Sequence, residues 1–415
     1  MMQDLCGIGN LAKCFVNMGA SRDLAQFFAL LLSVIATATV PLITVIFLIY
    51  IERKIAARVQ DRIGPNRVGP FGLLQPVADA IKLLIKEDIT PLGADKLIYN
   101  LAPIIAFASI VLLWAVIPYT PEHVGADLGI GVLYFMAVGS IVTVKVMVGG
   151  WASNNKYALL GAFRTIAQLL SYEVPLVLAL IVPVMIAGTL RMQGLIEAQQ
   201  GMWFVFMSPI AALTFFIANL AEVGRAPFDL IEAESEIVAG YNIEYSGFKF
   251  GMFMAGEFIH AFTICVLTAV IFLGGWSGPF AHEVPLLGFI YIGLKTAAVY
   301  VFMLVLRSTV PRIRIDQVMA FNWKFLVPLS IVNLLSIATV LFVARALGLN
   351  PPPELATDFV ANLPRTILLL LANLPAIALA LNIIRRWTRH QRQLEGSGLA
   401  ARHPQPAALT LPAGD

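Results

Sequence analysis

Apolar stretches of about 20 residues or more recur along this chain, and they constrain its fold more than any other feature. A transmembrane helix needs about 20 mostly apolar residues to cross the hydrocarbon core of a bilayer. Of the 415 residues, 59% are hydrophobic and 13% are charged, whereas a soluble domain has about 25% charged residues. So little charge cannot cover a water-facing surface. This excludes a soluble enzyme, a nucleic-acid-binding module and a disordered protein.

The apolar stretches predict an all-α protein, a polytopic transmembrane bundle of about nine helices. Pro41, Pro175 and Pro183 fall inside these stretches. They do not exclude helices, because neighbouring helices satisfy the carbonyls that a proline frees in a membrane. The expected spans are 24–50, 97–117, 129–148, 159–187, 203–221, 250–273, 286–306, 325–346 and 366–384.

The spans divide the chain into four parts. Residues 1–23 form an N-terminal segment, and residues 24–347 form a transmembrane core with an acidic loop at 222–248. Residues 348–393 supply one extra C-terminal span. The last part, 394–415, is rich in Ala, Pro and Gly, and this composition is typical of a disordered tail.

Lys and Arg residues are unevenly distributed among the connections between spans. The first connection contains eight of them, whereas the connections after the second and sixth spans contain none. Further arginines follow the seventh and ninth spans. Because basic connections of membrane proteins stay in the cytoplasm, we expect the N-terminus outside and the C-terminus in the cytoplasm.

A rigid turn and an amphipathic stretch stand out in the first connection. Five of the nine residues in the run GPNRVGPFG, residues 64–72, are Gly or Pro, which predicts a tightly turned backbone. Apolar residues at helical spacing follow over 73–86, with Asp79 and Lys82 on the polar face. This predicts a helix in the cytoplasmic interface. It either seals the bundle or frames an entry for a lipid-soluble molecule.

The acidic loop holds six carboxylates and a single base, Arg225, between residues 222 and 244. Such a run is usually a solvated face, but Phe228, Leu230 and Ile231 lie within it and favour partial burial. Crowded, partly desolvated carboxylates share protons, which suits a proton-transferring segment. The carboxylates are Glu222, Asp229, Glu232, Glu234, Glu236 and Glu244.

Several ionisable residues fall inside the expected spans. A charge at the centre of a membrane helix costs roughly 2.5–3.5 kcal/mol on insertion scales. Each single one is explained by a structural ion pair, but the set as a whole favours a polar axis through the bundle. The residues are Lys145, Arg164, Glu173, Glu257, His260 and Lys295, with Glu222 at a span end.

The cysteines are Cys6, Cys14 and Cys265, and they form no motif that ligates zinc or an iron–sulfur cluster. We therefore expect no metal site in this chain and expect any redox centre on a partner. The net charge of +3 is too small to indicate a nucleic-acid partner.

Five motifs of the chain, across roughly residues 25–345, resemble one family. The resemblance is to the quinone-site membrane subunit, or H subunit, of proton-translocating NADH:quinone oxidoreductase (respiratory complex I). This is the bacterial counterpart of the first mitochondrial NADH dehydrogenase subunit. The stretch at 220–247 is the longest and most specific. The motifs are IERK (51–54), GPNRVGPFGLLQPVADAIKL (64–83), WASNNKYALLGAFRTIAQLLSYEVP (151–175), LAEVGRAPFDLIEAESEIVAGYNIEYSG (220–247) and PRIRIDQVMAFNWKFLVPL (311–329).

The resemblance implies a fold and a role. Spans two to six would fold like half of an antiporter-type unit, and the chain would form the membrane part of a quinone chamber. Quinone would be the substrate, with membrane and peripheral complex I subunits and membrane lipid as partners and no nucleic acid. FMN and iron–sulfur clusters would lie on partner subunits. The extra span argues for a bacterial protein, placed in the inner membrane.

The resemblance also implies site residues, at the positions of this chain that match the family motifs. The implied quinone-site residues are Glu52, Arg53, Asp61, Arg62, Asp79 and Arg225. The implied proton relay comprises Glu173, Glu222 and Glu257, together with the loop acids Glu232, Glu234 and Glu236 beside the quinone. The implied supporting charges are Glu244, Lys295, Arg314 and Asp316.

Two residues depart from the family pattern. The run Met254-Ala255-Gly256-Glu257 is one residue longer than usual. One extra residue turns a helix by about 100°, so the sequence leaves open which way Glu257 faces. Lys145 is not part of the pattern.

Three other functions stay open on the sequence alone. A secondary transporter would need repeated halves with interrupted helices, and the sequence shows no such internal repeat. A passive membrane anchor would leave the buried acids without a role. An ion-coupling membrane subunit of a related hydrogenase, or of another quinone-type dehydrogenase, shares a diluted form of these motifs.

Overall fold

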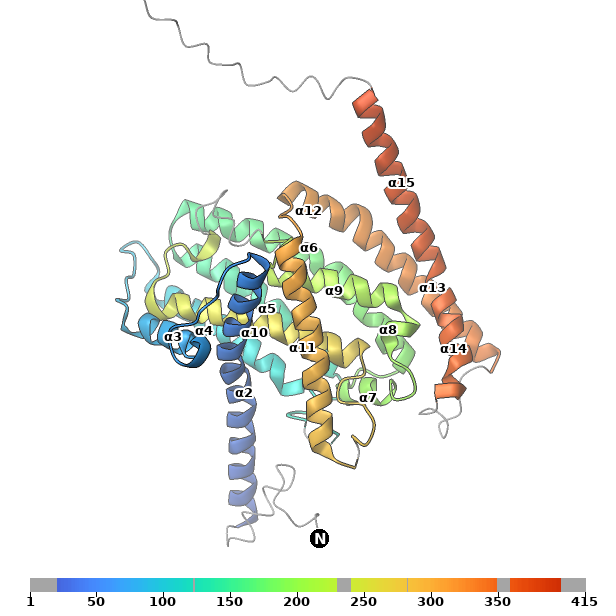
Figure 1. The fold of residues 1–415 in the computed structure, drawn as a ribbon, viewed down its shortest axis with the longest axis horizontal. Helices are drawn as coiled ribbons and strands as arrows, with labels where there is room; N and C mark the ends of the chain where they lie inside the picture. Colours follow the sequence, from blue (N-terminus) through green and yellow to red (C-terminus); the bar gives the residue numbers. More distant parts are fainter. Residues whose placement is uncertain (1–20, 122–123, 230–239, 282, 349–358, 397–415) are drawn as a thin grey trace, which may run out of the picture.

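The computed structural model describes residues 21–121, 124–229, 240–281, 283–348 and 359–396 (Figure 1). These residues form an all-helical bundle, which confirms the expected fold class. Within them, eight helical stretches are long and apolar enough to cross a membrane, and a ninth apolar helix is shorter. The acids Glu232, Glu234 and Glu236 and most of the expected tail lie outside the described residues.

Seven long helices lie where apolar stretches predict spans one to four and six to eight. Their length follows from the unbroken apolar runs, because a helix satisfies all of its backbone groups internally in lipid. They are α2 (Arg22–Val59), α4 (Lys96–Leu113), α5 (Gly131–Ala152), α6 (Lys156–Ala187), α10 (Gly247–Phe272), α11 (Pro285–Thr309) and α13 (Val327–Ala346).

The fifth span differs from the single helix expected at 203–221. The chain forms α8 (Phe204–Met207) and then α9 (Pro209–Val223), with non-helical angles at Ser208 of φ −142° and ψ 71°. Pro209 explains the break, because a proline disfavours the helical conformation of the residue before it. At 1.5 Å per residue α9 is about 22 Å long, which is shorter than the bilayer core.

The extra C-terminal span is also broken. It consists of α14 (Phe359–Leu371) and α15 (Leu374–Gly396) and begins earlier than the expected residue 366. Arg365 Nη2 donates to the carbonyl of Ile186 at 2.7 Å, and Asn373 Nδ2 donates to that of Met207 at 3.3 Å. The two helices are thus fastened to backbone carbonyls at the end of α6 and at the α8–α9 break. Figure 1 shows α15 reaching beyond the bundle.

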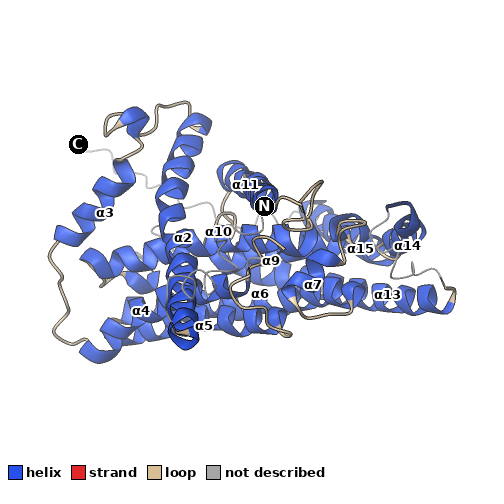
Figure 2. Cartoon of the chain, turned by 90° about the horizontal axis from the view of Figure 1, so that it is seen from below, coloured by secondary structure: helices blue, strands red, loops and turns tan. Residues whose placement is uncertain are grey.

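The amphipathic stretch of the first connection forms α3 (Gln75–Ile85), as predicted. Figure 2 shows α3 as a separate short helix beside α2. Its apolar residues Ile81 and Leu84 are 50% and 62% exposed, which fits a helix that rests on lipid. The Gly- and Pro-rich turn before it contains the 3₁₀ turn η2 (Pro70–Gly72).

The remaining elements are short. They are η3 (Trp114–Val116), α7 (Met192–Glu197), η4 (Gly240–Asn242), α12 (Ile315–Phe321) and the π-helical turn η5 (Asn322–Leu326), which continues into α13.

The odd-numbered connections gather at one end of the bundle, here called the basic end. Asp95 N donates to the carbonyl of Ala152 there, and Ile313 N donates to that of Pro227. The even-numbered connections gather at the other end, here called the opposite end. There Gly274 N donates to Gln199 Oε1 at 3.0 Å. This sorting agrees with the alternation of sides that the basic residues predict.

Candidate functional site

Glu52 lies at the centre of the charged residues at the basic end. Only 8% of its surface is exposed, and its carboxylate accepts a hydrogen bond from Arg225 Nη1 at 3.0 Å. Arg307 forms a second ion pair with Glu52, and the Tyr300 hydroxyl donates to it at 3.4 Å. Burying a carboxylate is costly unless other groups replace its water. Two guanidinium groups and a phenol do so here.

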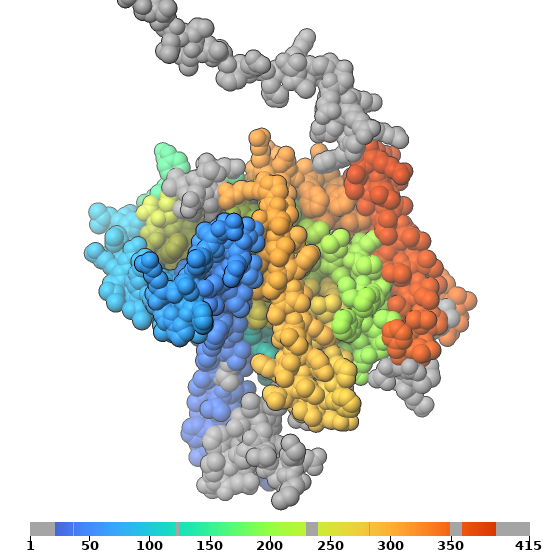
Figure 3. All heavy atoms as spheres, in the orientation of Figure 1, coloured from blue at the N-terminus to red at the C-terminus, as the bar shows by residue number. Residues whose placement is uncertain are grey.

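A hollow of about 380 Å³ opens beside Glu52, between the end of α2 and α11. Ile55, Val59 and Leu304 give it apolar walls, and Glu52 and Arg307 give it a charged side. Figure 3 shows α2 and α11 side by side on this face of the molecule. The hollow therefore combines an apolar wall with ion-paired groups that could hold a polar headgroup.

The sequence-based prediction of this site includes Glu52 and Arg225 but neither Arg307 nor Tyr300. Arg307 follows the seventh span, where the positive-inside rule already explains a basic residue. Tyr300 lies 248 positions from Glu52 in sequence, so no local pattern could connect the two.

Of the other predicted quinone-site residues, Arg53 and Arg62 line a second, wider hollow. Arg53 Nη1 pairs with Asp79 Oδ2 at 2.5 Å and links α2 to α3. A hollow of about 750 Å³ is lined by Arg53, Arg62 and the Gly- and Pro-rich turn up to Arg67. Asp61 is exposed just beyond α2 and is not among the residues that line either hollow.

Glu52, Arg225, Arg307 and Tyr300 are here called the Glu52 cluster. The segment after α9 connects this cluster to the inside of the bundle. Gly224, with φ 67°, ends α9 in the left-handed conformation that glycine favours. Asp229 accepts a hydrogen bond from Arg312 Nη2 at 2.7 Å. A cavity of about 70 Å³, large enough for water, is lined by Arg225, Asp229, Glu257 and Arg307. It reaches from the Glu52 cluster to Glu257.

Glu257 faces inward, which answers the question raised by its unusual spacing. It lies on α10 and accepts a hydrogen bond from the Tyr241 hydroxyl at 3.3 Å. It also interacts electrostatically with Lys145 of α5, a residue only 3% exposed. The sequence alone offers no partner for Lys145. Its position inside an apolar span was the only sign of a role.

The charged residues continue from Glu257 into the middle of the bundle. His260 lies three residues further along α10, on the same face, and its Nε2 is 4.0 Å from Glu222 Oε1. Glu222 interacts electrostatically with Glu173 of α6, which accepts a hydrogen bond from Ser140 Oγ. Contacts and electrostatic interactions therefore connect an axis of ionisable side chains from the Glu52 cluster to Glu173, which is partly exposed.

The supporting residues lie in different places. Glu244 accepts a hydrogen bond from Asn155 Nδ2 at 2.6 Å and so ties the loop before α10 to the start of α6. Arg314 and Asp316 begin α12, where Gln317 Oε1 accepts from the backbone N–H of Arg314. Lys295 lies at the opposite end, where its ammonium donates to the carbonyls of Gly275 and Ser277 at 2.9 and 2.8 Å.

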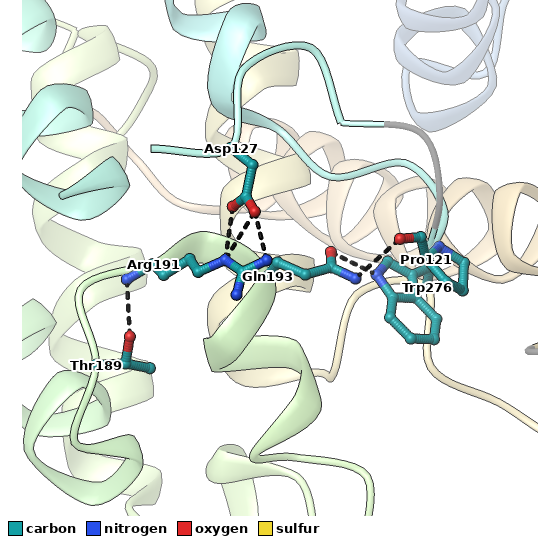
Figure 4. A network of polar contacts seen from close by, with 6 residues as sticks. All are labelled: Pro121, Asp127, Thr189, Arg191, Gln193 and Trp276. Carbon is teal, nitrogen blue, oxygen red and sulfur yellow. Dashed lines mark hydrogen bonds and ion pairs between the residues drawn. The ribbon is translucent and has the colours of Figure 1, made fainter. Parts of the chain in front are cut away.

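A polar network joins the connections at the opposite end (Figure 4). Arg191 Nε donates to both carboxylate oxygens of Asp127 at 2.8 Å, which raises the pKa of the Arg191 guanidinium. Gln193 Oε1 accepts from Trp276 Nε1 at 3.2 Å, and its amide donates to the carbonyl of Pro121 at 3.4 Å. These contacts bind α7 to the loops on either side of it.

Among the described residues, no group of three or more His, Cys, Asp or Glu side chains could hold a metal ion. The site is thus built from ion pairs, carboxylates and apolar walls. Fold and site together define a polytopic helical membrane protein with an ion-paired hollow at one end and a line of buried ionisable residues leading away from it.

The chain belongs to the NADH dehydrogenase family, whose family model matches residues 31–338. It is 48% identical over 303 residues to the H subunit of NADH-quinone oxidoreductase from Dehalococcoides mccartyi strain CBDB1, covering 73% of this chain and 84% of that relative. It is 48% identical over 326 residues to the protein of the same name from Geobacillus kaustophilus, covering 77% and 95%. A second form of the H subunit, from Geobacter sulfurreducens, is also 48% identical, over 305 residues.

Proposed function

We propose that this chain forms the membrane part of the quinone-binding chamber of an NADH:quinone oxidoreductase and couples quinone reduction to proton translocation. One observation carries the proposal. The Glu52 cluster borders a hollow with apolar walls, and a series of buried and partly buried ionisable residues leads from it into the bundle. The reaction in the proposal, oxidation of NADH by quinone, is taken from the names of the relatives.

The chemistry of quinone reduction suits this arrangement. Two electrons and two protons convert a quinone to a quinol, and negative charge develops on its oxygens before the protons arrive. Arg225 and Arg307 would stabilise that charge, because electrostatic interactions are strong in a site of low dielectric. The apolar residues Ile55, Val59 and Leu304 would contact the ring and tail. The lipid-facing side of α3 would border the entry from the bilayer.

Electrons would come from partner subunits. FMN and iron–sulfur clusters are expected there. This chain would contribute positioning and proton chemistry. The acids Glu232, Glu234 and Glu236 would respond to charge in the chamber, since their segment follows directly after Asp229.

The buried axis would transmit the reaction to proton-translocating partners. When a charge appears in the chamber, the ion pairs of Glu52 rearrange, and the change reaches Glu257 through the small cavity that contains Arg225. Lys145 and His260 then influence Glu222 and Glu173, because each group feels the charge of the next. The coupling is thus a sequence of electrostatic steps between neighbouring side chains.

The basic end would face the cytoplasm of a bacterium, and the chain would lie in the plasma membrane with its N-terminus outside. Labelling with an impermeant thiol reagent tests this orientation in a chain with Cys6→Ser and Cys14→Ser, because the N-terminal segment that carries these thiols is proposed to lie outside. Asn66→Cys at the basic end should be labelled only from the cytoplasmic side. Gly129→Cys at the opposite end, where an added Cβ meets no heavy atom within 4 Å, should be labelled only from outside. Labelling of both from one side would refute it.

The proton-coupling role is tested in the assembled complex with Glu257→Gln and Glu222→Gln. Both changes conserve volume and remove a titratable group. Quinone reductase activity and proton pumping should fall severalfold or more, while electron transfer to a hydrophilic acceptor upstream of the quinone should be retained. Glu197→Gln, on α7 at the opposite end, is the matched control and should leave all three unchanged. Normal quinone reduction and normal pumping in both variants would contradict the proposal.

A further inference from the structure

Fully buried carboxamide side chains occur on α6, on α9 and on the π-helical turn η5. Gln168, Asn219 and Asn322 each have no exposed surface. Among the described residues, no donor reaches the side-chain oxygen of any of the three. These residues are uncharged and are not part of the axis from Glu52 to Glu173.

The orientation of the three amides follows from their nitrogen atoms. Gln168 Nε2 donates to the carbonyls of Ala221 and Phe228 at 2.7 and 2.9 Å. Asn322 Nδ2 donates to the carbonyl of Ser171 at 2.5 Å, and Asn219 Nδ2 donates to that of Phe215 at 2.8 Å. A carbonyl only accepts, so exchanging nitrogen for oxygen would set two acceptors against each other. The oxygens are therefore the atoms that need donors.

Gln168 and Asn322 belong to one interlocked region. The partner of Asn322, Ser171, lies three residues after Gln168 and so on the same face of α6. Tyr172 donates its hydroxyl hydrogen to the carbonyl of Val318 at 2.9 Å and ties α6 to α12. These elements are neighbours in Figure 1.

The Phe228 ring reinforces this contact. It lies 5.4 Å from the Tyr172 ring and 6.2 Å from that of Phe321, measured between ring centroids. Gln168 and Asn322 thus border the place where α6, the end of α9 and η5 meet.

Buried polar groups in folded proteins are nearly always hydrogen-bonded, and ordered water supplies the bond where the protein has no partner to offer. A π-helical turn also widens the backbone locally, and such turns occur often at functional sites. We propose that Gln168 and Asn322 bind a small cluster of ordered water molecules between α6, the end of α9 and η5.

The bound water would lie next to the segment that carries Arg225 and Asp229. Gln168 contacts the carbonyl of Phe228, the residue before Asp229, and Asp229 pairs with Arg312. The cluster would therefore help to fix the position of this segment relative to α12. It would do so without adding charge to the interior.

A map of the assembled complex that resolves water tests the proposal directly. Density is expected within about 2.7–3.2 Å of Gln168 Oε1 and Asn322 Oδ1. The proposal is overturned if that map shows water elsewhere in the bundle but none at these oxygens. It is also overturned if protein donors occupy those positions.

A double-mutant cycle gives a second measurement. Gln168→Leu and Asn322→Leu should each lower the melting temperature of the assembled complex. The loss of melting temperature in the double variant should be smaller than the sum of the two single losses, because both residues hold the same water. Gln168→Leu combined with Gln199→Leu, at the opposite end, is the control and should be additive. Additive losses for Gln168 and Asn322 would overturn the shared cluster.

Discussion

At the basic end Glu52 is buried between Arg225 and Arg307 beside an open hollow. At the opposite end, by contrast, the side chain of Gln199 forms hydrogen bonds with backbone groups of neighbouring segments. Gln199 Nε2 donates to the carbonyls of Leu195 and Val270, and its oxygen accepts from the N–H groups of Phe204 and Gly274. A carboxylate between two arginines responds to a change in local charge. An amide with four hydrogen bonds does not titrate.

The difference separates two tasks within one bundle. In the proposed function, the ion pairs of the basic end would rearrange when charge develops in the chamber. The opposite end holds α7 in place with Gln193 and Gln199. The ammonium of Lys295 binds the connection after α10 and lies 4.7 Å from the ring centroid of Trp203. Such contacts stabilise a closed surface, which a membrane protein needs if protons are not to leak through it.

The largest effect is expected for Glu52→Leu at the basic end. The change leaves the guanidinium groups of Arg225 and Arg307 without their shared counter-ion. Removing one partner of a buried ion pair costs about 3–5 kcal/mol. The amount of assembled complex and its melting temperature should fall strongly, and quinone reduction should be lost.

Arg53→Met serves as the control for Glu52→Leu on the same helix. The Arg53–Asp79 pair is about half exposed, and exposed pairs contribute about 0–1 kcal/mol. Equal losses of stability in the two variants would show that Glu52 is not the centre of the basic end.

The next largest effect is expected for Glu234→Gln and Glu236→Gln. If these acids titrate as a coupled group beside the chamber, each change should lower quinone reductase activity severalfold or more. Electron transfer to a hydrophilic acceptor should survive. If assembly and quinone reduction are normal in both single variants and in the triple variant with Glu232→Gln, the segment is a solvated face.

Gln199→Leu should weaken the opposite end without affecting the reaction. It leaves the N–H groups of Phe204 and Gly274 without acceptors, and each unsatisfied buried donor costs about 1–3 kcal/mol. The melting temperature should fall, while quinone reduction per assembled complex should match the unaltered protein. A selective loss of activity at normal stability would place the opposite end in the reaction.

The smallest effect is expected for Asp127→Asn. The ion pair with Arg191 is exposed on both sides, and salt screens such pairs. A slight loss of thermal stability at low salt should disappear at high salt. A large loss that persists in salt would show that this pair, and not the amide contacts, closes the opposite end.

The sequence alone determined the class of fold, and it predicts on which side of the membrane the connections lie. Both depend on local composition, because crossing lipid requires long apolar runs and basic residues mark one set of connections. For the same reason, the amphipathic pattern located α3. The site was partly predictable, since Arg225, Glu222 and Glu257 stand out as charges in or beside apolar stretches.

Only the tertiary structure decided which charges meet. Glu52 and Arg225 lie 173 positions apart, and Glu52 and Tyr300 lie 248 apart. Lys295 binds backbone carbonyls at the opposite end, although its place in an apolar span equally favours a position in the buried axis. The choice depends on how helices rotate and pack against one another. Packing is set by many weak contacts between distant residues, which no single stretch of sequence contains.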